Sequence, residues 1–389
     1  MKAFNPQLNT WDDSALLQFF MSENMRRPEN INFGIGEMEF PTPQAVVDAC
    51  KEALDSGITF YMPTAGAPEL RRALAEACSG EYGLDFNENE IFVTPGGTNA
   101  IFVAILALAG QGAEVLYPNP GFPAYFPQIA LCNSIPVHYP LREDNRFIPD
   151  PDDIRRRITK KTKLLILNSP SNPIGNIIPS DTLKALADIA IANDIWVISD
   201  EAYRHLVYAP DKHSSIITFP GMRERTFLTC SFSKSYSMTG WRMGYIVAPS
   251  TFNEAFFKIF QYTVTCVSSF SQIAAAKAVQ LGDSYYRETL TQMTARKELI
   301  ERGLSEIPAV SFPKPQGAFY VFLNVHRTGL SSAEVSKTLL DDYSLVTIPG
   351  SAFGDLGEGY LRLSYASDLD NIKEGLERLK HAMQHLINQ

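Results

Sequence analysis

The stretch TFLTCSFSKSYSMTGWRMGYIVAP, Thr226–Pro249, sets a lysine and an arginine between two short apolar runs. TFLTC and GYIVAP have the length and apolar content of buried strands. Lys234 follows the first run among small hydroxyl residues, and Arg242 stands eight positions later. A lysine at a strand end inside a cleft loses hydration, which lowers its pKa and leaves a nucleophilic amine. Taken alone, however, a lysine is more often a surface residue.

Upstream of this stretch, from about Glu90, strand-like runs alternate with helical stretches. The runs IFVTP, EVLYP, LLIL and IWVIS are separated by the helical patterns TNAIFVAILALAG, PAYFPQIAL and DTLKALADIAIAND. Such alternation predicts an α/β fold with a mainly parallel sheet between two helical layers. After about Ser268, long amphipathic helices lead into a mixed region, which predicts a smaller α+β domain at the C-terminal end. The expected boundaries are 1–45 for an N-terminal arm, 46–280 for the large domain and 281–389 for the small one.

Two segments offer donors for an anion near the lysine. Ser231, Ser233 and Arg242 supply hydroxyls and a guanidinium, which are groups that hold phosphate. In TPGGTNAIF, the amides of Gly97 and Thr98 would open a helix toward the same anion. A Gly-Gly pair before a helix is more often a plain turn when it stands alone. Together the two segments predict a phosphate beside an amine.

Asp200 ends the apolar run IWVIS, so it is expected to be a buried carboxylate. A buried carboxylate needs a cationic or donor partner, and a protonated pyridine nitrogen is one. Asn172 and Tyr203 could donate to a phenolate oxygen on such a ring, and Phe122 could stack on its face. The alternative for Asp200 is the N-cap of a helix.

Composition narrows the class of protein. A formal net charge of -9 over 389 residues disfavours a nucleic-acid binder. The five cysteines are scattered without C-x-x-C spacing, so we expect no metal site and a reducing, cytoplasmic environment. No secretory pattern opens the sequence, and no apolar run approaches a membrane span. His381 and His385 stand four apart, but a solvated helix face explains them better than a metal site.

The stretch SFSKSYSMTGWRMGY closely resembles the lysine signature of the class I/II aminotransferases, which belong to fold type I of the pyridoxal-phosphate enzymes, the aspartate aminotransferase superfamily. Further motifs follow the family's order along almost the entire chain. They are YMPTAGAPELRRAL, TPGGTNAI, NPGFPAY, NSPSNPIG, SDEAY and LRLSYA. The resemblance implies a three-layer large domain and pyridoxal 5'-phosphate as cofactor.

The resemblance also implies roles for individual residues. Lys234 would hold the cofactor as an aldimine and act as the catalytic base, with Asp200 and Tyr203 as the other catalytic residues. Tyr61 would reach the phosphate in the neighbouring subunit, which implies a homodimer. The implied cofactor-binding residues are Gly97, Thr98, Phe122, Asn172, Asp200, Tyr203, Ser231, Ser233, Lys234, Arg242 and Tyr61. The implied substrate-binding residues are Arg362, which would clamp the α-carboxylate, Asn172, Gly36 and Ile35.

The implied reaction moves an amino group from an L-amino acid to a 2-oxo acid. Two alternatives stay open: another reaction on the same cofactor, such as that of a lyase, cyclase, decarboxylase or oxidase, and a non-catalytic regulator. The regulator would need an added DNA-binding module. Between Gln261 and Ile273 there is no basic residue, whereas Tyr262, Val267 and Phe270 are apolar or aromatic, which favours neutral or aromatic substrates.

The sequence departs from the family's pattern at two places near substrate-facing segments. Met38 stands where proline is usual, and Ile174 where threonine is usual. Both departures concern substrate specificity more than cofactor binding. In the N-terminal arm, the apolar residues Leu16, Phe19 and Phe20 are expected to anchor the arm, with an apolar substrate wall as the alternative.

Overall fold

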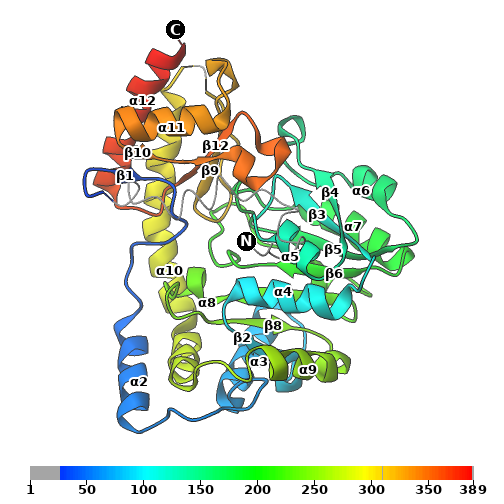
Figure 1. Cartoon of the computed structure of the whole chain (residues 1–389). Coiled ribbons are helices and arrows are strands. Elements are labelled where there is room, and N and C mark those ends of the chain that lie inside the picture. Colours follow the sequence, from blue (N-terminus) through cyan, green and yellow to red (C-terminus); the bar gives the residue numbers. More distant parts are fainter. Residues whose placement is uncertain (1–26, 309, 388–389) are drawn as a thin grey trace, which may run out of the picture.

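The computed structural model describes residues 27–308 and 310–387. The residues Leu16, Phe19 and Phe20 therefore lie outside the described part. The described chain has two main sheets, and the long helix α10 (Ser269–Ser305) runs from the layer of the larger sheet to the smaller one (Figure 1). This helix is interrupted at Gly282, whose φ of 45° and ψ of -131° are not helical. The two helical patterns expected after Ser268 thus form one long element with a break.

The larger sheet has seven strands. In spatial order they are β2 (Ile91–Thr94), β8 (Gly244–Val247), β7 (Thr226–Ser231), β6 (Trp196–Asp200), β5 (Thr162–Asn168), β3 (Glu114–Asn119) and β4 (Ile135–Pro140). Neighbouring strands are parallel except that β8 runs antiparallel to both β2 and β7. The predicted α/β fold with a mainly parallel sheet is confirmed.

Helices cover both faces of this sheet because successive strand side chains point to opposite faces. Phe92 packs into one apolar cluster and the next residue, Val93, into another on the opposite face. The first face is covered by α4 (Gly97–Leu108), α5 (Tyr125–Leu131) and α9 (Asn253–Thr263). The other is covered by α3 (Pro68–Tyr82), α6 (Pro151–Arg157), α7 (Ser180–Ala192) and α10. Outside these, α2 (Gln44–Asp55) packs on α10.

The smaller sheet is antiparallel, in the order β11 (Ile348–Pro349), β12 (Tyr360–Ser364) and β9 (Tyr320–Asn324). It packs with α11 (Ser332–Tyr343) and α12 (Leu369–Ile387). The short strand β1 (Ile31–Asn32) pairs in parallel with β10 (Leu345–Val346). The segment that follows β1 can therefore cross from the smaller sheet toward the larger one.

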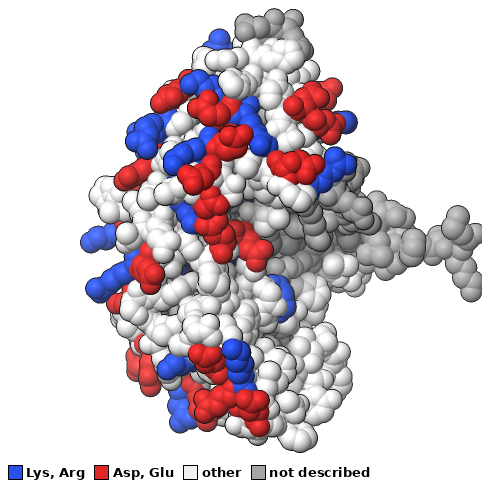
Figure 2. All heavy atoms as spheres, turned by 90° about the vertical axis from the view of Figure 1, so that its left-hand side faces the viewer, with Lys and Arg blue, Asp and Glu red and all other residues white. Residues whose placement is uncertain are grey.

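Charge on the surface is mixed in sign. Figure 2 shows acidic and basic side chains interspersed on the face that carries α2 and α10, without a broad basic stripe. Within the described residues, no helix combines the length and apolar character that a membrane crossing requires.

Candidate active site

The carboxyl ends of three central strands meet at one edge of the larger sheet. Asn168 at the end of β5 is paired in register with Asp200 at the end of β6, and Ser231 ends β7. Beside them lies a cavity of about 340 Å³ that the smaller sheet helps to close. Every predicted site residue except Tyr61 lines it, namely Ile35, Gly36, Gly97, Thr98, Phe122, Asn172, Asp200, Tyr203, Ser231, Ser233, Lys234, Arg242 and Arg362.

Lys234 lies in α8 (Phe232–Ser235), a single helical turn directly after β7. Its amine donates a hydrogen bond to the carbonyl of Gly36 and lies 5.7 Å from the centroid of the Phe319 ring. Burial lowers the pKa of Lys234 to about 8; Glu37 opposes this shift, and the two arginines of the cavity add to it. A large share of this amine is therefore neutral near pH 8, as a nucleophile or base must be.

Asp200 is buried, and its carboxylate accepts a hydrogen bond from the Tyr125 hydroxyl at 2.7 Å. The amide of Ala202 donates to the other oxygen at 3.3 Å. The N-cap alternative does not hold, because residues 202–205 form turns rather than a helix. Burial raises the pKa of Asp200 to about 6, although both donors oppose the shift. Within residues 27–308 and 310–387, no cation pairs with this carboxylate.

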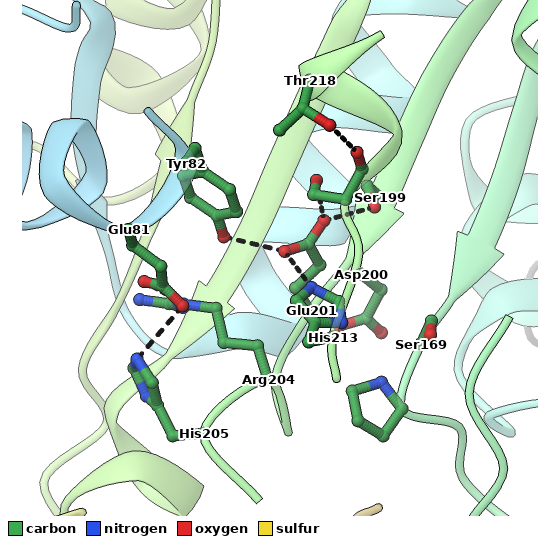
Figure 3. Close-up of polar contacts among 12 residues, drawn as sticks. Glu81, Tyr82, Ser169, Ser199, Asp200, Glu201, Arg204, His205, His213 and Thr218 are labelled. Carbon is green, nitrogen blue, oxygen red and sulfur yellow. Dashed lines mark hydrogen bonds and ion pairs between the residues drawn. The ribbon is translucent and has the colours of Figure 1, made fainter. Parts of the chain in front are cut away.

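The next residue, Glu201, lies in different surroundings. Its carboxylate accepts hydrogen bonds from Tyr82 and Ser199, each at 2.7 Å, and from Ser215, and it pairs with the imidazole of His213 at 2.8 Å (Figure 3). Burial by itself would raise the pKa of Glu201, but His213, Ser215 and Ser199 lower it below its ordinary value. The network ties the segment after Asp200 to α3 and to the strand end, so it holds Asp200 in place.

One end of the cavity is built from α4, α8 and the Arg242 side chain. Gly96 precedes α4 with a φ of 87°, and the first amides of α4 have no side-chain cap within the described chain. A Cβ at Gly96 would lie 2.7 Å from Nη2 of Arg242, and one at Gly97 would lie 3.1 Å from Cβ of Ser231. Both glycines therefore allow the backbone amides to approach an anion that the guanidinium also reaches.

Arg362 on β12 is buried at the opposite end of the cavity. One Nη donates to the Asn172 side-chain oxygen at 3.1 Å and the other to the carbonyl of Gly34. The rings of Tyr320 and Phe353 lie 4.5 and 5.0 Å from the guanidinium carbon. Its Nε is buried without a partner among the described residues. A carboxylate is the ligand that matches this fork of donors.

The ring of the expected cofactor would lie between these two ends. The Tyr203 hydroxyl lies 2.8 Å from that of Tyr320 and faces the cavity. Phe122 also lines the cavity and meets Tyr125 edge to face, with ring centroids 5.6 Å apart. A carboxylate without a cation, an anion seat and an amine thus occur in one cavity, and this set fits pyridoxal phosphate.

Some residues singled out from the sequence lie elsewhere. Tyr61 and Tyr262 are 86% and 87% exposed and do not line the cavity. Val267 and Phe270 do not line it either, so the segment that suggested apolar substrates is not its wall in this chain. The apolar lining comes instead from Ile35, Ile101, Phe122, Pro123 and Ile348.

The two departures from the family's motifs are core residues. Met38 is 4% exposed and packs with the apolar cluster of the smaller sheet, and Ile174 is fully buried in the cluster under α7. Neither side chain lines the cavity. The sequence reasoning missed Tyr125 and Tyr320, which do contact site residues. Tyr125 ends the motif NPGFPAY, which was the available signal, whereas Tyr320 is hidden in the apolar run AFYVFLNV.

Comparison with known proteins gives consistent matches over nearly the whole chain. The model of the family "Aminotransferase class I and II" matches residues 28–379. An aspartate aminotransferase from Pyrococcus horikoshii is 39% identical over 356 residues, which cover 91% of this chain and 90% of that protein. The crystal structure of an aromatic aminotransferase from the same organism has a TM-score of 0.89 at 38% identity, covering 92% of this chain and 97% of that one. The aspartate aminotransferase from Thermus thermophilus with maleate has a TM-score of 0.92 at 31% identity, covering 98% and 100%.

Proposed function

The chain belongs to the class I and II aminotransferases, an enzyme family that depends on pyridoxal phosphate, and we propose that it transfers the amino group of neutral or aromatic L-amino acids to 2-oxo acids. The observation that supports this substrate class most directly is the lining of the cavity. Its cations among the described residues are Lys234, Arg242 and Arg362, and each is assigned to a different task. Among the described residues, no further cation lines the cavity to receive a second carboxylate.

The site residues divide these tasks by position. When bound, the cofactor supplies an aldehyde for amines and a pyridine ring that takes up the electrons left behind when a Cα proton leaves. The neutral amine of Lys234 would take that proton from Cα, and the ammonium so formed can give the proton back later in the reaction. Asp200 would keep the ring nitrogen protonated, because no cation among the described residues pairs with its carboxylate. Arg362 and Asn172 hold the α-carboxylate, which fixes the orientation of the Cα bond that breaks.

Part of the cavity lining is apolar, and we assign this part to the substrate side chain. Ile35, Ile101 and Ile348 line the cavity with Phe122 and Pro123. Burying an apolar side chain there stabilises the complex by roughly 1.5–3 kcal/mol, whereas burying an unpaired carboxylate is costly. Relatives named for aspartate and for aromatic amino acids both support an amino-acid substrate, and the lining favours the second class.

A panel of amino acids tests this proposal. We expect kcat/KM for L-phenylalanine or L-leucine to exceed that for L-aspartate by about 10- to 100-fold. In single turnovers, the absorbance change made by the amino acid should be reversed by a 2-oxo acid. A preference for aspartate would overturn the substrate class alone. Release of ammonia, or consumption of oxygen, without reversal by the oxo acid would overturn amino transfer in favour of a lyase or oxidase.

A homodimer with shared sites is part of the same proposal. Phe60, Tyr61 and Tyr262 are 83%, 86% and 87% exposed, and aromatic rings so exposed are typical of an interface. Tyr61 would then serve the phosphate of the partner subunit. We expect that mixing and refolding Lys234→Ala with Tyr61→Ala subunits restores activity that neither variant has alone, since one site of each mixed dimer is intact. Failure of this rescue, with mixed dimers shown to form, would exclude the shared site. The five free cysteines support a cytoplasmic location.

A further inference from the structure

Tyr320 occupies a position that the proposed mechanism does not use. It begins β9, is 1% exposed and lines the cavity from the smaller sheet. In the β9–β12 pairing, Tyr320 lies opposite Ser364 and Phe322 lies opposite Arg362, which puts Tyr320 and Arg362 on the same face. The register of this sheet therefore places the Tyr320 ring beside the guanidinium, 4.5 Å from its central carbon.

The hydroxyl end of the Tyr320 side chain contacts residues outside the smaller sheet. The Tyr320 hydroxyl lies 2.8 Å from the Tyr203 hydroxyl, and the two rings meet edge to face with centroids 5.6 Å apart. The backbone of Gly36 closes over this oxygen, since a Cβ at that glycine would lie 2.3 Å from it. The hydroxyl is thus held between Tyr203 and the segment that also receives the Lys234 amine.

The proton positions in the Tyr203–Tyr320 pair follow from the proposed role of Tyr203 as a hydrogen-bond donor. If Tyr203 donates its proton to a ring oxygen in the cavity, its own oxygen becomes the acceptor for the proton of Tyr320. Two hydrogen bonds then run in one direction, and each strengthens the other. The charged groups that face the pair are Arg362 from β12 and Asp200 from β6. Neither group supplies an alternative hydrogen-bond donor to the Tyr203 oxygen in the described structure.

We propose that Tyr320 is a positioning residue that couples the two ends of the active site. Its hydroxyl supports Tyr203 as the donor to the cofactor's ring oxygen, while its ring holds the Arg362 guanidinium in line with the substrate's carboxylate. The inference rests on the proposed function, because both partners take their roles from it. It goes beyond that function by assigning two separable tasks to one side chain.

Two variants of the cofactor-loaded enzyme separate these tasks. Tyr320→Phe removes the hydroxyl and keeps the ring, whereas Tyr320→Leu removes both. The first measurement is a pH titration of the cofactor-loaded enzyme without substrate, followed by its absorbance. The quantity compared is the pH at the midpoint of the absorbance change. In Tyr320→Phe we expect this midpoint to rise. Tyr203 becomes a weaker donor, so the ring oxygen keeps more negative charge, and the proton that titrates beside this oxygen is lost at a higher pH. The rise should be smaller than in Tyr203→Phe, and KM should stay within about twofold.

The second measurement is KM. In Tyr320→Leu we expect KM for the amino acid to rise by about 3- to 30-fold, since the guanidinium loses the ring beneath it. If the leucine variant does not fold, Tyr320→Met replaces it in this KM measurement, since methionine fills more of the space of the tyrosine ring. Tyr360→Phe is the matched control: this hydroxyl donates to Glu143 at 2.7 Å from the same sheet, outside the cavity, and its loss should change neither readout.

A double variant decides whether the hydroxyl acts through Tyr203. On the Tyr203→Phe background, Tyr320→Phe should cause no further rise of the midpoint. An unchanged midpoint in Tyr320→Phe, or an equal rise on both backgrounds, would overturn the hydroxyl's role. An unchanged KM in the leucine and methionine variants would overturn the ring's role. If the wild-type enzyme fails to transfer amino groups, the proposed function fails, but the substrate-free titration still tests the hydroxyl pair.

Discussion

Asp200 and Glu201 are neighbours in the sequence and both are buried, yet their carboxylates are held in opposite ways. Glu201 has four donors on its two oxygens, from Tyr82, Ser199, His213 and Ser215. Asp200 has a tyrosine hydroxyl and one long backbone contact, and no cation in the described chain. The pKa of Glu201 is lowered, whereas that of Asp200 is raised to about 6.

This difference is the one expected between a carboxylate that stabilises the fold and one that binds a ligand. Glu201 is satisfied by the protein, so its contribution is to the folded state. Asp200 carries a desolvated charge for which the described residues supply no cation, so we expect a ligand to supply it. The stability of the protein should therefore change in opposite directions when each of the two residues is replaced by its isosteric amide.

The largest expected effect is on stability. Glu201→Gln replaces one acceptor oxygen by an amide that donates, so at least one of the four donors loses its partner. We expect the free energy of unfolding of the cofactor-free protein to fall by about 3–5 kcal/mol, as for a broken buried pair. Asp200→Asn is the matched control and should lose no stability at pH 7. Urea unfolding followed by circular dichroism measures the stability of both variants. Equal losses of stability would contradict the distinction between the two carboxylates.

The next effect is on catalysis. In Asp200→Asn we expect kcat to fall by about 100- to 1000-fold, because a neutral amide no longer keeps the ring nitrogen protonated. The protein should stay folded and still bind the cofactor. Steady-state kinetics with saturating cofactor measures this. An Asp200→Asn enzyme with nearly full kcat would show that the carboxylate has no role at the ring.

The smallest effect is on the pH dependence of stability. Because the folded pKa of Asp200, about 6, lies above its ordinary value of about 3.9, the group contributes stability below about pH 4 that is lost as pH rises through 6. Glu201 behaves oppositely, since its lowered pKa contributes stability at neutral pH that is lost in acid. We expect Asp200→Asn to gain about 1–3 kcal/mol relative to wild type between pH 4 and 7, measured by urea unfolding without cofactor. A constant difference over this range would contradict the raised pKa.

The sequence was informative about Asp200 and uninformative about Glu201 for a physical reason. A carboxylate that ends an apolar strand is expected to be buried at a strand end, and local pattern reveals that much. The partners of Glu201 come from residues as distant in sequence as Tyr82, and only the packing of α3 against the sheet brings them together. The predicted Asp200 partner was a cofactor nitrogen, and the Tyr125 hydroxyl was not foreseen.

Elements with strong periodicity were predicted and weaker ones were not. The central strands and the helices α4 and α7 were predicted, because buried strands and amphipathic helices have distinct apolar patterns. The strand β4 was missed: IPVHYP contains two prolines and a histidine, and this strand lies at the edge of the sheet with two exposed and two half-buried residues. The antiparallel direction of β8 was also not predicted, since direction depends on the connection between strands rather than on their composition.

Lys234 is, in our proposal, the amine that reacts with the cofactor, and Asp200 is the carboxylate that pairs with its ring nitrogen. Borohydride reduction of the loaded protein, followed by peptide mass mapping, tests it most directly. We expect one added cofactor mass on the peptide that contains Lys234, and no such adduct in Lys234→Ala. An adduct on another lysine of the wild-type protein, or one that persists in Lys234→Ala, would contradict it.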